Sequence, residues 1–143
     1  MHPNLRRAVI IVVLGFVGYL LWYVNGNAVT GDQSTSMSKP SYVLRLIPAS
    51  GAGVPVQDRV GIDLSSGYDA YLDLNGLEIR NVVIDPTADG LVRSGTGTIS
   101  YQPAEGHRIE RLDSGENCVT AFVWKQEEGR GTASPLRWCF TAT

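Results

Sequence analysis

The sequence is short of the residues with which many proteins carry out chemistry. Its two cysteines, Cys118 and Cys139, stand too far apart for a C-x-x-C redox motif. Of its two histidines, only His107 lies beyond the first few residues, and no nucleophile or set of metal ligands surrounds it in sequence. The glycines of 92–100 are followed by neither a lysine nor a helix, and 84–90 lacks the ligand spacing of a calcium loop. We therefore predict no catalytic, cofactor-binding or metal-binding residues, and no enzyme.

Charge is missing from one stretch near the N-terminus. Residues 8–24 contain no charged side chain, and as a helix they would measure roughly 25 Å, which is the short end of the range for a membrane span. Arg6 and Arg7 precede the stretch, and no further Lys or Arg occurs before Lys39. The positive-inside rule therefore predicts a single transmembrane helix over 8–24, with the N-terminus in the cytoplasm and the rest of the chain outside.

A cleaved secretory signal is the alternative reading of the same stretch. Gly26-Asn27-Ala28 loosely fits the small residues of a cleavage site. The length of the apolar run and the bulky Trp22 at its end favour a retained anchor instead. Both readings place the remaining residues in the periplasm or the extracellular space, beyond a bacterial cytoplasmic membrane.

Composition then divides the chain into four parts. We expect a cytoplasmic N-terminus (1–7), a transmembrane helix (8–24), a flexible polar linker (25–40) and one extracytoplasmic domain (41–143). From Pro40 onward, 9 Lys and Arg stand against 13 Asp and Glu, a net charge of −4. This balance disfavours a nucleic-acid partner, which would be met by a basic patch.

Residues 41–143 lack any sustained helical period and show short alternating strands between turn residues, which is typical of an all-β sandwich or barrel. The clearest signal is 68–80, where Asn75-Gly76 suits a two-residue type I′ turn because both positions need positive φ. Folding there opposes Leu74 with Leu77 and Leu72 with Ile79, and places their side chains on one face.

The two cysteines fit a second hairpin. Pairing Cys118 with Cys139 opposes Val119 with Trp138, and it gathers apolar side chains on one face of both strands. These side chains are Val119, Ala121, Val123, Leu136, Trp138 and Phe140. Directly opposed cysteines on adjacent strands are close enough for a disulfide, which an oxidising compartment would close. We predict a structural disulfide between Cys118 and Cys139.

The same C-terminal segment resembles the last two strands of bacterial immunoglobulin-like domains. These show a Leu-x-x-Gly-x-Asn-x-Val entry into one strand and Trp-x-Phe in the last. The matching residues here are Leu112, Gly115, Asn117, Val119, Trp138 and Phe140. The resemblance covers about a quarter of the chain and implies an immunoglobulin-like β-sandwich, commonly a binding or spacer module; it transfers no catalytic residue.

A narrower resemblance concerns a metal. The membrane-anchored copper chaperone of cytochrome oxidase assembly is similarly organised as one span followed by an immunoglobulin-like domain, and it carries a Cys-Phe-Cys-Phe motif. This chain has Trp138-Cys139-Phe140-Thr141 and so lacks one of those two thiols. The difference disfavours copper delivery, since a thiol pair is what suits Cu(I).

Two surfaces are candidates for contact with a partner. Phe122 and Trp124 should point outward beside the disulfide and Arg137, and such exposed residues are enriched at interfaces. Alternatively, the linker or the 50–58 loop covers them, or a bulge turns Trp124 inward. In the apolar segment, a stripe of Ile11, Gly15, Gly18 and Trp22 could pack against other transmembrane helices.

From these features we predict a non-catalytic accessory subunit of a larger respiratory or photosynthetic membrane complex, with transmembrane helices of that complex as partners. A free-standing, membrane-anchored envelope module that binds glycan or peptide is the alternative, and a metal chaperone is the third hypothesis.

Overall fold

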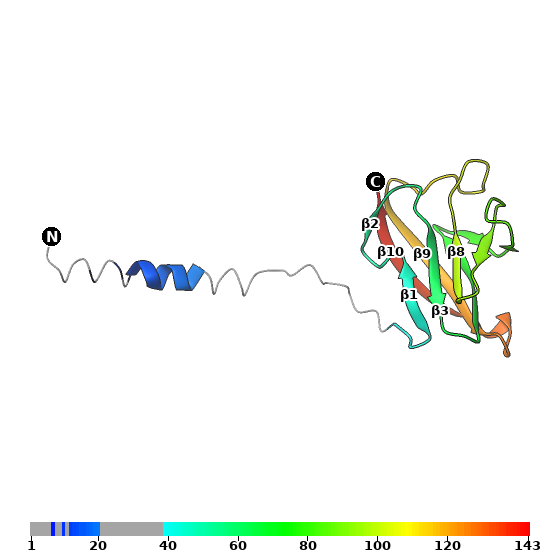
Figure 1. Ribbon diagram of the computed structural model, residues 1–143, viewed down its shortest axis with the longest axis horizontal. Helices are drawn as coiled ribbons and strands as arrows, with labels where there is room; N and C mark the ends of the chain where they lie inside the picture. The colour runs from blue at the N-terminus through cyan, green and yellow to red at the C-terminus, as the bar shows by residue number, and fades with distance from the viewer. Residues whose placement is uncertain (1–6, 8–9, 11, 21–38) are drawn as a thin grey trace. The chain divides into compact units, whose positions relative to one another are not determined.

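The computed structural model describes residues 7, 10, 12–20 and 39–143. The chain forms two compact units, Met1–Thr35 and Ser36–Thr143, which are treated separately (Figure 1).

The N-terminal unit contains a helix over residues 12–20. Among the described residues, no helix is both long and apolar enough to cross a membrane. Residues 8, 9, 11 and 21–24 of the predicted transmembrane helix lie outside the described residues, so the span over 8–24 stays a prediction. Gly15 and Gly18 lie in this helix, and a side chain added at either would meet nothing within 4 Å. Ile11, Trp22 and nearly all of the predicted linker 25–40 lie outside the described residues.

The C-terminal unit is built from two five-stranded sheets packed face to face (Figure 1). The first sheet has the order β1 (Val43–Ile47), β3 (Val60–Leu64), β8 (Thr98–Tyr101), β7 (Leu91–Arg93), β6 (Val82–Val83). The second has the order β2 (Gly53–Val54), β10 (Ser134–Ala142), β9 (Gly115–Lys125), β4 (Tyr68–Leu74), β5 (Leu77–Ile79). Both sheets are mixed, because β6 pairs with β7 and β2 pairs with β10 in parallel. The two packed sheets confirm the predicted all-β sandwich.

The hairpin between β4 and β5 forms as predicted. Asn75 has φ 52° and Gly76 has φ 86°, the left-handed values that a type I′ turn needs at both positions. Leu74 pairs with Leu77 and Leu72 with Ile79, so the predicted register is confirmed. The turn is short enough that local chain chemistry fixes it.

The hairpin between β9 and β10 also has the predicted register, with Val119 opposite Trp138 and Ala121 opposite Leu136. The side chains predicted to share its inner face contribute to the core: Val119, Ala121, Val123, Trp138 and Phe140 are buried, and Leu136 is partly buried against them. A 3₁₀ turn, Arg130–Thr132, lies in the connection.

One buried polar side chain joins this hairpin to the turn before β5. Asn117 is 0% exposed; its Nδ2 donates to the carbonyls of Asp113 (2.7 Å) and Gly115 (3.1 Å). Its Oδ1 accepts from Asn75 Nδ2 (2.8 Å) and from the backbone N–H of Asp113 (3.1 Å). Asn75 in turn exchanges two bonds with the backbone of Cys118.

This network explains the Leu-x-x-Gly-x-Asn-x-Val pattern in physical terms. Leu112 and Val119 are buried on either side of the turn, and Gly115 adopts φ 104°, which few other residues tolerate. Asn117 supplies the amide that holds the intervening backbone, so each residue of the pattern has a defined structural role.

We predict that Asn117→Ala lowers the free energy of unfolding by about 2–4 kcal/mol. The substitution removes two donors and an acceptor inside the protein and leaves their backbone partners without a bond. Urea unfolding followed by tryptophan fluorescence would measure the change, with Asn81→Ala, at an exposed asparagine, as the control. Equal effects of both substitutions would contradict a special role for Asn117.

Candidate functional site

Cys118 and Cys139 form a disulfide on the outer side of the second sheet. They are directly opposed across β9 and β10, with Cα atoms 4.1 Å apart, as in a pair whose backbone groups do not bond to each other. The backbone of Cys118 bonds to Asn75 instead, and the carbonyl of Cys139 accepts from Gly51. Both cysteines are half-buried, so the disulfide is reached from solvent.

Glu116 completes a group of three potential metal ligands. A carboxylate oxygen of Glu116 and the sulfur atoms of Cys118 and Cys139 all lie within 4.8 Å of one another. Glu116 is exposed and comes two residues before Cys118, which places both side chains on the same side of β9. Within the described part of the chain, no other three His, Cys, Asp or Glu residues meet in this way. The sequence analysis missed Glu116, although its spacing from Cys118 in a predicted strand was the available signal.

His107 offers no free nitrogen to a metal. Its Nδ1 lies 3.1 Å from the carbonyl oxygen of Gln102 and its Nε2 lies 2.8 Å from that of Thr87. Only the protonated ring can donate to both carbonyls, and these two acceptors, that of Thr87 first, raise the pKa of His107 above its ordinary value. The side chain therefore ties the 85–90 loop to the segment after β8.

Tyr101 fixes the same region from inside. Its hydroxyl donates to Asp89 (2.9 Å) and accepts from the backbone N–H of Ile109 (3.1 Å). Asp89 also accepts from the backbone N–H of Arg108. Burial raises the pKa of Tyr101 to about 12, so the hydroxyl keeps its proton throughout the physiological range. These contacts hold residues 107–113 against the sandwich.

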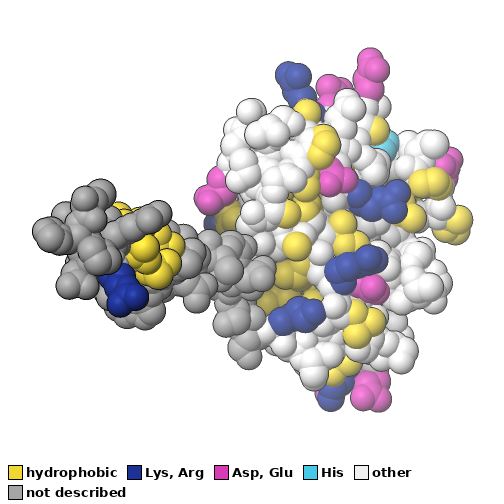
Figure 2. Space-filling view, turned by 60° about the vertical axis from the view of Figure 1, so that its left-hand side comes forward, with side chains coloured by type: hydrophobic (Ala, Val, Ile, Leu, Met, Phe, Trp, Pro, Cys, Tyr) yellow, Lys and Arg dark blue, Asp and Glu magenta, His cyan; other side chains and the backbone are white. Residues whose placement is uncertain are grey.

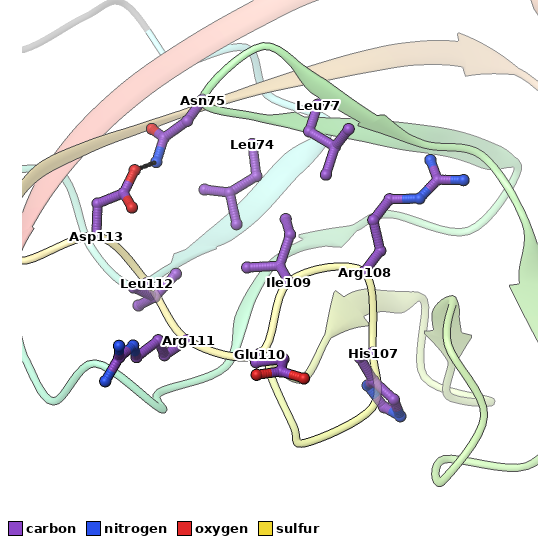
Figure 3. A pocket seen from close by; sticks show the side chains of 10 residues that line it. All are labelled: Leu74, Asn75, Leu77, His107, Arg108, Ile109, Glu110, Arg111, Leu112 and Asp113. Carbon is purple, nitrogen blue, oxygen red and sulfur yellow. Dashed lines mark hydrogen bonds between the residues drawn. The ribbon is translucent and has the colours of Figure 1, made fainter.

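Residues 107–113 and β5 enclose an open cleft of about 530 Å³ (Figure 3). Leu74 and Leu112 form its buried floor, and Leu77 and Ile109 point toward each other across it. Its rim is charged, with Arg108, Glu110, Arg111 and Asp113 around the opening. The cleft combines apolar walls with charged edges.

The predicted partner surface is less exposed than expected. Phe122 is half-buried, Arg137 is exposed, and Trp124 is only 6% exposed. The pairing of β4 with β9 is unbroken from Tyr68 to Leu74, so no bulge turns Trp124 inward. Trp124 remains on the outer side, where neighbouring side chains cover it.

The covering residues are aromatic and cationic. Tyr71 stacks on Phe122 with ring centroids 4.7 Å apart and lies 6.1 Å from Trp124. Arg80 lies over the Tyr71 ring, and Arg130 over the Trp124 ring at 5.4 Å. The sequence analysis missed Tyr71, because its position opposite Phe122 depends on the pairing of strands far apart in the chain. The arrangement stabilises the outer side of the sheet and leaves little of Trp124 for a partner.

No protein-family model and no curated protein matches the chain. Among solved structures, CopC from Methylosinus trichosporium OB3b is 12% identical over 71% of this chain and 91% of that chain, with a TM-score of 0.48. PcoC, a copper resistance protein from Escherichia coli, is 12% identical over 71% of this chain and 98% of that chain, with a TM-score of 0.46. The chain resembles them in its β-sandwich fold. At this identity the likeness concerns the fold alone.

These findings correct the functional prediction. The solved structures that resemble the chain include CopC and a copper resistance protein, and neither of these two is described as a subunit of a respiratory or photosynthetic complex. The accessory-subunit prediction, with its electron-transport and photosynthetic roles, is therefore wrong, and the alternative of a membrane-anchored binding module is set aside with it.

We predict that His107 contributes more to stability in acid than at neutral pH. Because its pKa is raised on folding, its contribution is fully present below the unfolded value of about 6.5 and is lost as the pH rises through the folded value. The difference in free energy of unfolding between the parent and His107→Gln should therefore be largest near pH 5 and shrink toward pH 8. These two pH values lie roughly 1.5 units below and above the unfolded pKa of histidine. His2→Gln, which changes the other histidine, is the control, and a pH-independent difference for His107→Gln would refute the assignment.

Proposed function

We propose that the sandwich is an extracytoplasmic domain that binds a thiophilic metal ion, Cu(I), through Cys118 and Cys139 in their reduced state. The observation that carries the proposal is the meeting of the two sulfur atoms and a Glu116 oxygen within 4.8 Å. Metal and disulfide are then alternative states of one site, and the metal is cargo rather than a resident cofactor.

Opening the site requires two electrons and two protons. A protein dithiol of the oxidoreductase type would supply them by thiol–disulfide exchange, in which the cysteine pair becomes two thiols and the dithiol becomes a disulfide. Binding of Cu(I) to both sulfurs then releases the two protons, because the thiolate is the form that ligates metals. Half-burial leaves the sulfur atoms accessible to such a reductant.

The strands favour Cu(I) in two ways. Thiolates are soft ligands that suit Cu(I), and the two cysteines lie on neighbouring paired strands that keep their side chains together after reduction. Glu116 adds an exposed carboxylate, which can act as a weaker third ligand or accept the proton that a thiol loses when its sulfur binds the metal. The lack of a second thiol beside Cys139 in sequence is thus compensated by Cys118 across the sheet.

The disulfide also bears on the compartment and the class of the domain. A closed cysteine pair fits an oxidising compartment, which agrees with an extracytoplasmic location. We infer in addition that the sandwich is immunoglobulin-like, supported by the Leu112, Gly115, Asn117 and Val119 pattern and its network, and that the domain is not an enzyme.

We predict that the reduced protein binds one Cu(I) per chain and that the oxidised protein binds none at that site. Anaerobic titration against a chromophoric Cu(I) chelator would measure the affinity after removal of the reductant. Cys118→Ser or Cys139→Ser should weaken binding by at least about 100-fold, equivalent to ~2.7 kcal/mol, because one thiolate is lost. Glu116→Gln should weaken it by less, and Glu105→Gln, at an exposed residue away from the site, should leave it unchanged.

Folding must be monitored in the same samples. The disulfide closes a loop with a sequence separation of 21, so reduction should lower stability by about 3 kcal/mol while the apolar core persists. Circular dichroism of the reduced protein and of both serine variants would verify this. The proposal fails if all three are folded and bind Cu(I) equally well, or if the folded reduced parent binds none.

A further inference from the structure

One side of the sandwich carries most of its exposed large hydrophobic side chains. In the described part of that unit these are Leu44, Leu77, Val82 and Ile84, and three of the four fall within 77–84. Ile84 is 100% exposed, which is an unfavourable position for an aliphatic side chain in a monomer. Isolated exposed apolar residues are common in proteins, but three so near in sequence, one of which lines the cleft, indicate a contact surface.

The same side contains the last strand of each sheet. β5 ends the second sheet and β6 ends the first, and they follow each other directly in sequence. Both are very short, with three and two residues. Edge strands present unpaired backbone groups and are where chains of one kind most readily associate. The side opposite, formed by β1 and β2, exposes Leu44 alone of these large hydrophobics.

A projecting residue and a receiving cleft both occur on this side. Ile84 projects between β6 and the turn at Asp85, which accepts from the backbone N–H and the hydroxyl of Thr87. The cleft between β5 and residues 107–113 has apolar walls, Leu77 and Ile109, that face each other (Figure 3). An aliphatic side chain would replace water between those walls.

Charge next to the two features is complementary. Asp85 follows Ile84 directly and is exposed, and hydrogen bonds from Thr87 lower its pKa, so it is anionic at neutral pH. Arg111 lies exposed on the rim of the cleft and belongs to none of the ion pairs of the described residues. Arg108, also on the rim, is partly engaged by the carbonyl of Glu78. An incoming Ile84-Asp85 pair would therefore meet apolar walls and a free guanidinium.

We propose that this side of the sandwich binds a second copy of the chain, with Ile84 of each copy in the cleft of the other and Asp85 facing Arg111. Projection and cleft adjoin in one molecule, since His107 contacts Thr87 and Arg108 contacts Asp89. Because the projecting Ile84 and the cleft adjoin, one patch of the surface can pair with the same patch on a second copy. Such a self-complementary contact gives a closed two-fold dimer rather than an open chain. Figure 2 shows hydrophobic side chains interspersed with charged ones on the face of the sandwich that it draws.

The first test compares two exposed aliphatic residues on opposite sides. Sedimentation velocity of the full chain in mild detergent, over a wide range of concentrations, should show a reversible dimer. Ile84→Ser should raise the dimer dissociation constant by about tenfold or more, because it loses its apolar contact. Leu44→Ser, the matched control on β1, should leave the constant unchanged. Equal shifts for both variants, or a parent that stays monomeric at the highest concentration, overturn the proposal.

The second test separates this contact from association through the apolar N-terminal segment. Asp85→Arg and Arg111→Asp should each weaken the dimer, because each puts like charges in contact, and the double variant should restore it. The single variants should also respond to salt in the opposite direction from the parent, since screening weakens an attraction and relieves a repulsion. A double variant no tighter than the singles overturns the proposed pairing. Metal binding by the reduced protein is measured separately, so the two proposals can fail independently.

Discussion

The carboxamide of Asn117 is the constraint on which the rest of the sandwich depends. It is fully buried and forms hydrogen bonds with two carbonyls, a backbone N–H and the side chain of Asn75. A buried amide is costly unless all its groups are paired, so these bonds fix the backbone on both sides together. Asn75 also accepts a hydrogen bond from the backbone of Cys118, so Asn117 positions that strand indirectly. The bond from the backbone of Asp113 to Asn117 holds the end of the segment that forms the cleft.

Both proposed sites adjoin Asn117, but different kinds of structure hold their residues in place. Glu116 and Cys118 are the two neighbours of Asn117 on β9, where strand geometry points both side chains to the side opposite that of Asn117, and Cys139 lies opposite Cys118 on β10. The cleft precedes it in the 107–113 segment, which is held by Tyr101 and His107 as well. The first site rests on a rigid strand pair and the second on a loop secured by hydrogen bonds.

Local chemistry explains what the sequence could predict. Asn75-Gly76 admits one tight turn, and alternation fixed both hairpin registers, because a slip by one residue would expose the core side chains. Features that depend on distant strands were not accessible: Tyr71 meets Phe122 only through the pairing of β4 with β9, and its neighbours hide Trp124. Leu44 is exposed at an irregularity in the strand pairing between Val43 and Arg45, which the alternation of residue types does not reveal. The cleft joins residues more than thirty positions apart and has no sequence signature.

The position of β10 has a consequence for biosynthesis. It is the last strand in sequence, yet it lies inside the second sheet between β9 and β2, which belongs to the beginning of the domain. Residues near β2 bond to it through Thr141 and Thr143, and Gly51 bonds to Cys139. The second sheet thus cannot be completed while a ribosome or a translocation channel still holds residues 134–142. Completion of the sandwich therefore waits until residues 134–142 are free to pair, and until then β9 and the earlier strands expose apolar faces that a holding chaperone would have to shield.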